Sequence, residues 1–366
     1  MWPHRGRSSI PSENLIACQS IAGQRDLLAD SIVARHYSLR PDLASRYGDA
    51  GRTKCVKDAR DLLDGLAEAI AAGRPQLFTD YIAWAKVLLC ARGIPVQDLA
   101  ESLELCRQAI EEVLPRSQAA VAEQYLLDSL ARLPALPTET PSYLRSDRPL
   151  ADLAREYLNA LLEADRRQAS QLVMDAIQKG TSVRDIYLHV FQQSQYEIGR
   201  LWQSNQMSVA QEHLCTAATQ LIMSQLYPLI FATERKNRRI VTACVGGDLH
   251  EIGIRMVADL FEMAGWDTFY LGADVPSASI VQTVIDRDAH VLAVSTTLTT
   301  NISSVINLIA EVRSNLACEH TIILVGGHPF NVAAELWREV GADGHAADAV
   351  EAIDLAELLL LEEATA

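Results

Sequence analysis

The sequence predicts a multidomain protein with an all-α first region, a four-helix bundle and an α/β region built on a flavodoxin-like (Rossmann-type) sheet. Two observations lead to this fold class. From about residue 240 onward, apolar runs typical of strands alternate with amphipathic helical patterns, whereas the chain before it shows helical spacing. In addition, 366 residues exceed what one hydrophobic core usually fills, so two or three domains are expected.

Residues 1–133 are expected to form a compact domain of five to seven helices, for which we consider a globin-like packing. The helices predicted at 55–72 and 75–92 each end at a glycine, and prolines open the helices that follow. Residues 134–150 contain four prolines and are predicted to be an extended linker, because proline cannot continue a helix.

Residues 151–235 are predicted to form four helices joined by short loops, and therefore an antiparallel bundle. These helices are expected over 153–164, 166–179, 183–205 and 208–232. In residues 236–366, strands are expected over 239–246, 267–271, 290–295, 320–325 and 343–346, and helices over 251–264, 277–287, 301–314, 330–340 and 348–361. This alternation predicts a parallel, doubly wound sheet that binds its ligand at the carboxyl ends of the strands.

Composition narrows the class of function. Hydrophobic residues make up 49% of the chain, but no apolar run reaches the roughly 18 residues of a membrane helix. The first residues lack the apolar core of a signal peptide, so a cytoplasmic location is expected. Seven scattered cysteines indicate reduced core residues rather than a disulfide framework. A net charge of −15 argues against nucleic acid as a direct partner.

Three polar or glycine-rich loops follow predicted strands. The segment 248–253 follows the apolar run 240–245, the segment 295–297 begins after 41 further residues, and the segment 326–328 after another 28. Because the carboxyl ends of parallel strands lie at one edge of a sheet, we expect these loops to meet there. The candidate site residues in them are Asp248, His250, Gly253, Ser295, Thr297, Gly326 and Gly327.

This pattern resembles the signature of cobalamin-binding domains that hold the corrinoid with its own base displaced and with a histidine as the lower axial ligand of cobalt. The resemblance implies that His250 is the cobalt ligand. It also implies that Asp248 hydrogen-bonds the other ring nitrogen and so fixes the tautomer. An isolated Asp-x-His would instead indicate a loop turn or a helix N-cap.

The same resemblance assigns roles to the other loop residues. Gly253 would make room for the nucleotide tail of the corrinoid, and Ser295 would line the slot for its displaced dimethylbenzimidazole. Gly326 and Gly327 would let the backbone approach that tail closely, since they have no Cβ atom. Thr297 stands where leucine is common, and it is expected to line the pocket.

A second group of candidates lies in the predicted bundle, where Trp202 is followed after nine residues by Glu212 and His213. This spacing resembles the cap of cobalamin-dependent photoreceptors. By that resemblance Trp202 would cover the 5′-deoxyadenosyl group, Glu212 would bond its ribose and His213 would support the pocket. Gln203 stands where the light-sensing repressors have a histidine, which rules out cobalt ligation by that residue. The alternative is a helix-end tryptophan and a solvated Glu-His pair.

The order of the regions is similar to that of the photocobilins, which pair cobalamin with biliverdin in an adjacent helical domain. A linear tetrapyrrole needs an apolar slot and cationic anchors for its propionates. Candidates for these contacts are Arg35, His36, Tyr37, Arg40, Arg46, Arg52, Lys54, Tyr81 and Trp84. Cys55 or Cys90 could form a thioether with a vinyl group, although a buried reduced cysteine is more common. Haem or no ligand are the alternatives.

These resemblances together predict a light sensor rather than an enzyme. Adenosylcobalamin would lie between bundle and sheet, with biliverdin as second chromophore, and light would cleave the cobalt–carbon bond and change a homo-oligomer that signals to a partner protein. The competing interpretation is a corrinoid methyl-carrier protein of a methyltransferase system, which predicts use of methylcobalamin and no light-dependent change of size. A subunit of an adenosylcobalamin mutase is a third interpretation, disfavoured because no catalytic barrel is present.

Overall fold

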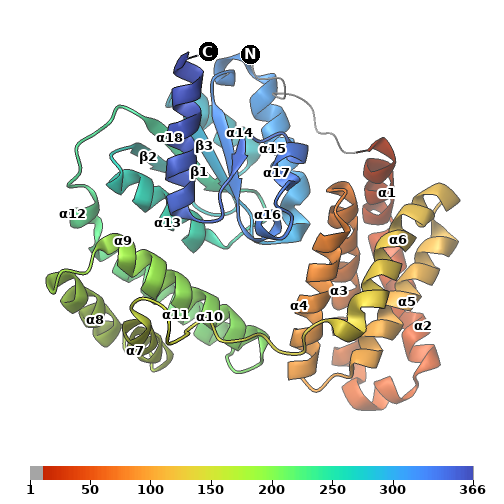
Figure 1. Ribbon diagram of the computed structural model, residues 1–366. Coiled ribbons are helices and arrows are strands. Elements are labelled where there is room, and N and C mark those ends of the chain that lie inside the picture. Colours follow the sequence, from red (N-terminus) through yellow and green to blue (C-terminus); the bar gives the residue numbers. More distant parts are fainter. Residues whose placement is uncertain (1–10, 366) are drawn as a thin grey trace.

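The computed structural model describes residues 11–365, and Figure 1 shows how they are arranged. A first group of helices packs beside a five-stranded sheet, and a second group of helices lies against the opposite side of the same unit. No helix in the described part of the chain is long and apolar enough to cross a membrane.

Six helices form the first region of the described chain, a number within the expected range. They are α1 (Ser12–Gly23), α2 (Arg25–Leu39), α3 (Asp42–Ala71), α4 (Pro75–Ala91), α5 (Val96–Val113) and α6 (Arg116–Arg132). The helix predicted at 55–72 starts earlier than expected, because α3 continues through a kink at Gly48. Gly48 has a φ of 60°, a conformation that glycine adopts without a steric penalty.

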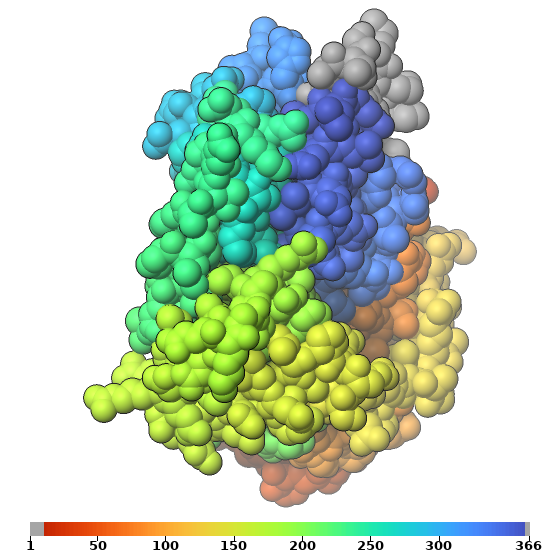
Figure 2. All heavy atoms as spheres, turned by 60° about the vertical axis from the view of Figure 1, so that its left-hand side comes forward, coloured from red at the N-terminus to blue at the C-terminus, as the bar shows by residue number. Residues whose placement is uncertain are grey.

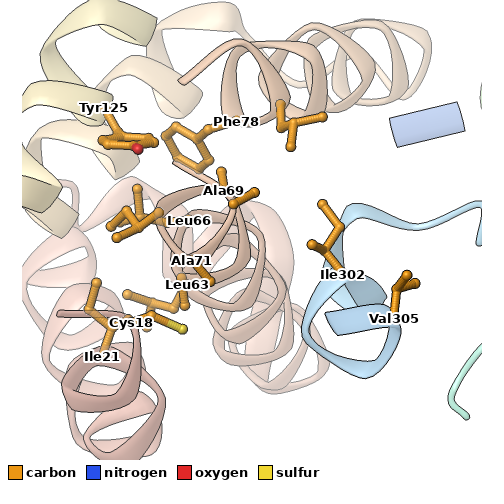
Figure 3. Close-up of a cluster of buried hydrophobic side chains, with 14 of the residues drawn as sticks. Cys18, Ile21, Leu63, Leu66, Ala69, Ala71, Phe78, Tyr125, Ile302 and Val305 are labelled. Atoms are coloured by element: carbon orange, nitrogen blue, oxygen red, sulfur yellow. The ribbon is translucent and has the colours of Figure 1, made fainter. Parts of the chain in front are cut away.

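The core of the first region is continuous with one face of the sheet. Leu63 and Leu66 of α3 and Phe78 of α4 are fully buried in it (Figure 3). The same hydrophobic cluster includes Ile302 and Val305, which belong to α15 (Ile302–Ser314). Burial of these side chains therefore holds the first region to the sheet unit.

A segment without regular structure follows the short 3₁₀ helix η1 (Leu133–Ala135) and leads to the second group of helices. This group comprises α7 (Ala151–Leu162), α8 (Arg166–Gln178), α9 (Val183–Asp185), the π-helical η2 (Ile186–Phe191), α10 (Gln192–Gln203), α11 (Val209–Gln225) and α12 (Tyr227–Ile230). The helix expected at 208–232 is interrupted at Leu226, because Pro228 lacks the N–H that would continue α11.

The helices α7 to α11 share a core with the sheet unit. Tyr157, Tyr187 and Phe191 are fully buried in that core, together with Met256 and Leu260 of α13 (Glu251–Met263). Figure 2 shows this group of helices directly below the C-terminal helix α18 (Ala349–Thr365). The group therefore packs on the face of the sheet unit that α13 and α18 cover.

The sheet contains five parallel strands in the order β2-β1-β3-β4-β5, which confirms the predicted flavodoxin-like order. The strands are β1 (Arg239–Cys244), β2 (Asp267–Tyr270), β3 (Val291–Ser295), β4 (Ile322–Gly326) and β5 (Gly344–His345). Cys244, Ser295 and Gly326 are neighbours across β1, β3 and β4. This register brings the three loops that follow these strands to one edge of the sheet.

Helices cover both faces of the sheet. Besides α13, α15 and α18, they are α14 (Ser277–Asp286), α16 (His328–Val332) and α17 (Leu336–Val340), with the 3₁₀ helices η3 (Thr299–Asn301) and η4 (Leu316–Cys318). The single helix expected at 330–340 is thus two short helices. The seven cysteines are free, as expected.

Candidate functional site

Asp248 joins two of the three loops at the carboxyl edge of the sheet. Its side chain is fully buried, and Oδ1 accepts hydrogen bonds from Nδ1 of His250 at 2.8 Å and from the backbone N–H of His250 at 2.9 Å. Oδ2 accepts a hydrogen bond from Oγ1 of Thr296 at 3.1 Å and another from the backbone N–H of Thr297. Four donors therefore fix the position of one carboxylate.

These bonds determine the electrostatics of the pair. Burial alone would raise the pKa of Asp248, but the hydrogen bonds from His250 and from Thr297 hold that pKa below its usual range. The bond to Asp248 raises the pKa of His250, and the charges of Asp248 and Glu212 add to this rise. The proton on Nδ1 faces Asp248, which leaves Nε2 of a half-exposed ring as the available ligand atom.

The glycines of the site differ in what they require. Gly327 has a φ of 102°, and a Cβ atom there would lie 1.9 Å from the carbonyl oxygen of Thr296, so the backbone itself demands glycine. A Cβ atom on Gly326 would lie 3.2 Å from the carbonyl oxygen of Ala346. A Cβ atom on Gly253 would have no atom within 4 Å, so the start of α13 faces open space.

Glu212 comes from α11 in the second group of helices, and Gln220 of the same helix donates a hydrogen bond to Glu251 beside His250 at 2.7 Å. Glu212 lies in the first turn of α11, where Oε1 accepts a hydrogen bond from Oγ1 of Thr216 at 2.9 Å and Oε2 lies 2.5 Å from Nδ1 of His213. Its negative charge adds to the rise in the pKa of His250. The His213 side chain itself is 73% exposed.

Trp202 lies at the end of α10, where it packs against the first region. Its ring stacks on that of Trp84 with centroids 6.1 Å apart, and the guanidinium carbon of Arg92 lies 6.0 Å from the Trp202 ring centroid. Gln203 is buried, and its Nε2 donates a hydrogen bond to the carbonyl oxygen of Trp84 at 3.0 Å. Trp202 and Gln203 thus form a contact between α10 and α4.

The cationic candidates of the first region are largely engaged with acids. The ion pairs join Arg35 to Glu112, His36 to Glu101, Arg40 to Asp42 and Glu101, and Arg46 to Asp98. Arg52 lies over the ring of Tyr37, and Tyr81 stacks on Trp84. Four of the six cationic candidates are thus paired with acids of the same region, whereas Arg52 and Lys54 are exposed.

Sequence reasoning overlooked Thr296, which is fully buried and bonds Asp248. Its position directly after β3, between Ser295 and Thr297, was the available signal. At the same edge, the amide nitrogen of Asn301 is buried and has no hydrogen-bond partner among the described residues. An imidazole nitrogen free to bind a metal, an open space at Gly253 and an unpaired amide donor fit a corrinoid with polar side chains.

Two family models match the chain, and both describe a B12 binding domain: one covers residues 238–354 and the other residues 153–227. A corrinoid protein of Desulfitobacterium hafniense is 24% identical over 216 residues, which span 58% of this chain and 99% of that protein. The dimethylamine corrinoid protein 3 of Methanosarcina acetivorans is 31% identical over 129 residues, 35% of this chain and 59% of that protein.

A solved structure shows a similar fold. The monomethylamine corrinoid protein of Methanosarcina barkeri matches with a TM-score of 0.51 and 21% identity, and the match covers 57% of this chain and 98% of that chain. At this identity the likeness concerns the fold alone.

These comparisons correct the expectation of a light sensor. The relatives named above are corrinoid proteins, and none of them is a photoreceptor, so the assignments as a cobalamin-dependent photoreceptor and as a photocobilin with biliverdin are wrong. The physical reason is that the spacing of Trp202 and Glu212 fixes their places on two helices but not their neighbours, and the structure stacks Trp202 on Trp84. The expectation that the chain is not itself an enzyme is confirmed, since these relatives are corrinoid proteins.

Proposed function

We propose that this chain is a corrinoid-binding carrier protein of a methyltransferase system. The observation that carries the proposal is the Asp248–His250 pair at the carboxyl edge of the sheet, within the stretch that matches a B12 binding domain. The second match, over residues 153–227, covers the helices packed on α13, and one of them, α11, reaches Glu251 beside His250 through Gln220. The corrinoid proteins with which the chain aligns support the same assignment.

In this proposal, His250 would hold the corrinoid through Nε2, and Asp248 accepts the hydrogen bond from Nδ1. The buried carboxylate keeps the ring in one orientation and increases the basicity of Nε2. Thr296 and Thr297 keep Asp248 in place through their hydrogen bonds. Ser295 and the open space at Gly253 would receive the nucleotide tail.

We assign the regions as a helical domain (1–133), a linker (134–150), a four-helix cap (151–235) and a corrinoid-binding domain (236–366). The cap would cover the upper face of the corrinoid and exclude water from it. The helix α11 supports this assignment, because its Gln220 donates a hydrogen bond to Glu251, the residue that follows His250. A cytoplasmic location stays a prediction.

When bound, the corrinoid would supply a cobalt centre able to carry a methyl group between partner enzymes. The residues of this chain bind and orient the cofactor, and substrate recognition would belong to the partner methyltransferases. The relatives named for dimethylamine or monomethylamine indicate the class of methyl donor that such systems use. We propose methylated amines as the first donors to test with a partner enzyme.

Reconstitution with separate cobalamins tests the proposal. Protein in the dark is titrated with methylcobalamin, hydroxocobalamin and adenosylcobalamin, and its size is measured before and after illumination. We expect stoichiometric retention of methylcobalamin and hydroxocobalamin, at least tenfold weaker binding by His250→Ala, and no light-dependent change of size. The matched control is His320→Ala, which removes a histidine whose side chain is 86% exposed. Equal retention by His250→Ala and the wild type, or no retention by the wild type, would contradict the proposal.

A further inference from the structure

Helix α4 of the first region touches both sides of the proposed corrinoid site. On the sheet side, Oδ2 of Asp80 lies 2.7 Å from Nε2 of His328, the residue that follows Gly327 at the start of α16. On the bundle side, Trp84 stacks on Trp202 of α10. Asp80 and Trp84 are four residues apart and lie on the same face of α4, so one helical turn bridges the two parts.

The bundle contact of α4 is small and specific. The carbonyl oxygen of Trp84 accepts a hydrogen bond from Gln203, and Nη1 of Arg92 donates to the carbonyl oxygen of Gln203 at 3.1 Å. The Trp84 side chain is 40% exposed, so this contact has little buried area around it. A stacked pair and a few hydrogen bonds are worth little individually, and they are therefore easy to break and remake.

The sheet contact of the first region is much stronger. Besides the Asp80 pair, a carboxylate oxygen of Glu68 accepts a hydrogen bond from the backbone N–H of Ser303 at 2.8 Å, and Arg74 pairs with Glu339 of α17. The hydrophobic core that includes Ile302 also joins the two (Figure 3). The first region thus stays with the sheet if its bundle contact opens.

The element η2 and the helix α10 follow each other directly and form one helical rod. The end of this rod away from α4 is attached to α13. There the hydroxyl of Tyr187 donates a hydrogen bond to Asp259 at 2.7 Å, and the chain itself continues from α11 through α12 into β1. Tyr187 and Trp202 are fifteen residues apart, which is about 22 Å along a helix. Along the rod formed by η2 and α10, the α4 contact and the Tyr187 contact with α13 therefore lie at opposite ends (Figure 1). The other attachments of this helix group also go to α13, through the shared hydrophobic core and through a hydrogen bond from Gln220 to Glu251 at 2.7 Å.

We propose that α4 is a latch: its contact with Trp202 and Gln203 holds the bundle closed over the carboxyl edge of the sheet, while the α13 attachment serves as the hinge. This inference rests on the proposed function, because the face that opens is the one a partner enzyme must reach. A partner that docks at the end of α10 would displace α4 and open the site. The first helical region then regulates access to the cofactor.

The test uses Trp84→Ala and Gln203→Ala, each of which removes a latch contact. Trp84 is 40% exposed and lies outside the hydrophobic cores, whereas Gln203 is buried and its side chain also accepts a hydrogen bond from Thr140. The matched control is Tyr196→Ala, because Tyr196 is a 47% exposed aromatic on α10 that contacts Tyr143 of the linker and not α4. Small-angle scattering of the corrinoid-free proteins measures the radius of gyration. The rate at which cyanide ligates bound hydroxocobalamin measures access to the upper face.

We expect both latch variants to show a larger radius of gyration and cyanide ligation about tenfold faster than the wild type, with the control variant unchanged. Wild-type values in both latch variants would overturn the latch. If no protein retains hydroxocobalamin, the proposed function fails, and the scattering comparison still decides the latch because it needs no cofactor.

Discussion

Replacing Asp248 by asparagine tests the construction of the site most sharply, because it turns one of the two acceptor oxygens in a fully occupied set of hydrogen bonds into an NH₂ donor. The carboxylate receives two donors from His250 on Oδ1, and donors from Thr296 and Thr297 on Oδ2. Asparagine has one acceptor oxygen, so its NH₂ group must face one of these sides. If the NH₂ group takes the place of Oδ2, the hydroxyl of Thr296 can turn and accept a hydrogen bond from it, but the backbone N–H of Thr297 can only donate.

One buried N–H group therefore loses its acceptor and meets another donor. An unsatisfied buried donor costs about 1–3 kcal/mol, which we expect as the loss in free energy of unfolding without cofactor. Loss of the carboxylate behind the imidazole lowers metal affinity by about 10–100-fold at comparable sites, and we expect a similar loss in affinity for hydroxocobalamin.

Urea unfolding of the corrinoid-free protein and a spectroscopic titration with hydroxocobalamin give the two quantities. Asp152→Asn is the matched control, because the Asp152 side chain is 90% exposed and pairs only locally with Arg155. If Asp248→Asn had the stability and the affinity of the wild type, the hydrogen-bond network would not be what positions His250.

Two further substitutions give predictions on stability that urea unfolding can check. Burial raises the pKa of Glu68 from 4.5 to about 7, so the folded state loses stability as the pH rises from 4.5 through 7. Glu68→Gln should raise the free energy of unfolding by about 3 kcal/mol at pH 8 and by less at pH 6. An equal gain at both pH values would refute this. Gly327→Ala should cost at least about 2 kcal/mol through strain and the clash with Thr296. Gly199→Ala, in open space on α10, should gain about 0.5–1 kcal/mol, and similar effects of the two would contradict the backbone argument.

The sheet was predictable because its signals are local. Apolar runs of strand length alternate with helical spacing after residue 240, and alternation of this kind leaves few topologies open. The three loops were predictable for the same reason: a motif directly after a parallel strand must lie at the carboxyl edge. The register that places Cys244, Ser295 and Gly326 side by side agrees with that reasoning.

The interactions within the site were not predictable, because they depend on side-chain directions across distant segments. Spacing identified Asp248 but not the bond from Thr296, which is 48 residues away. The positions of Trp202 and Glu212 were found, yet periodicity could not show that α4 would supply the stacking partner Trp84. A functional assignment made from that spacing alone was therefore wrong.

The boundaries of helices failed where a single residue changes the backbone. Gly48 lets α3 bend instead of ending, and Pro228 separates α12 from α11. Both effects depend on whether tertiary packing continues the helix on the other side of the break. Local propensity does not contain that information.

Electron paramagnetic resonance of the cob(II)alamin form tests the central claim, that His250 is the lower ligand of cobalt, most directly. Protein grown with [¹⁵N]histidine and protein at natural abundance are each reconstituted and compared. Ligation by His250 predicts a threefold superhyperfine splitting at natural abundance that becomes twofold with the label, and loss of the labelled signal in His250→Ala. A threefold splitting that persists in the labelled protein would mean that the corrinoid's own base binds cobalt, and it would contradict the account.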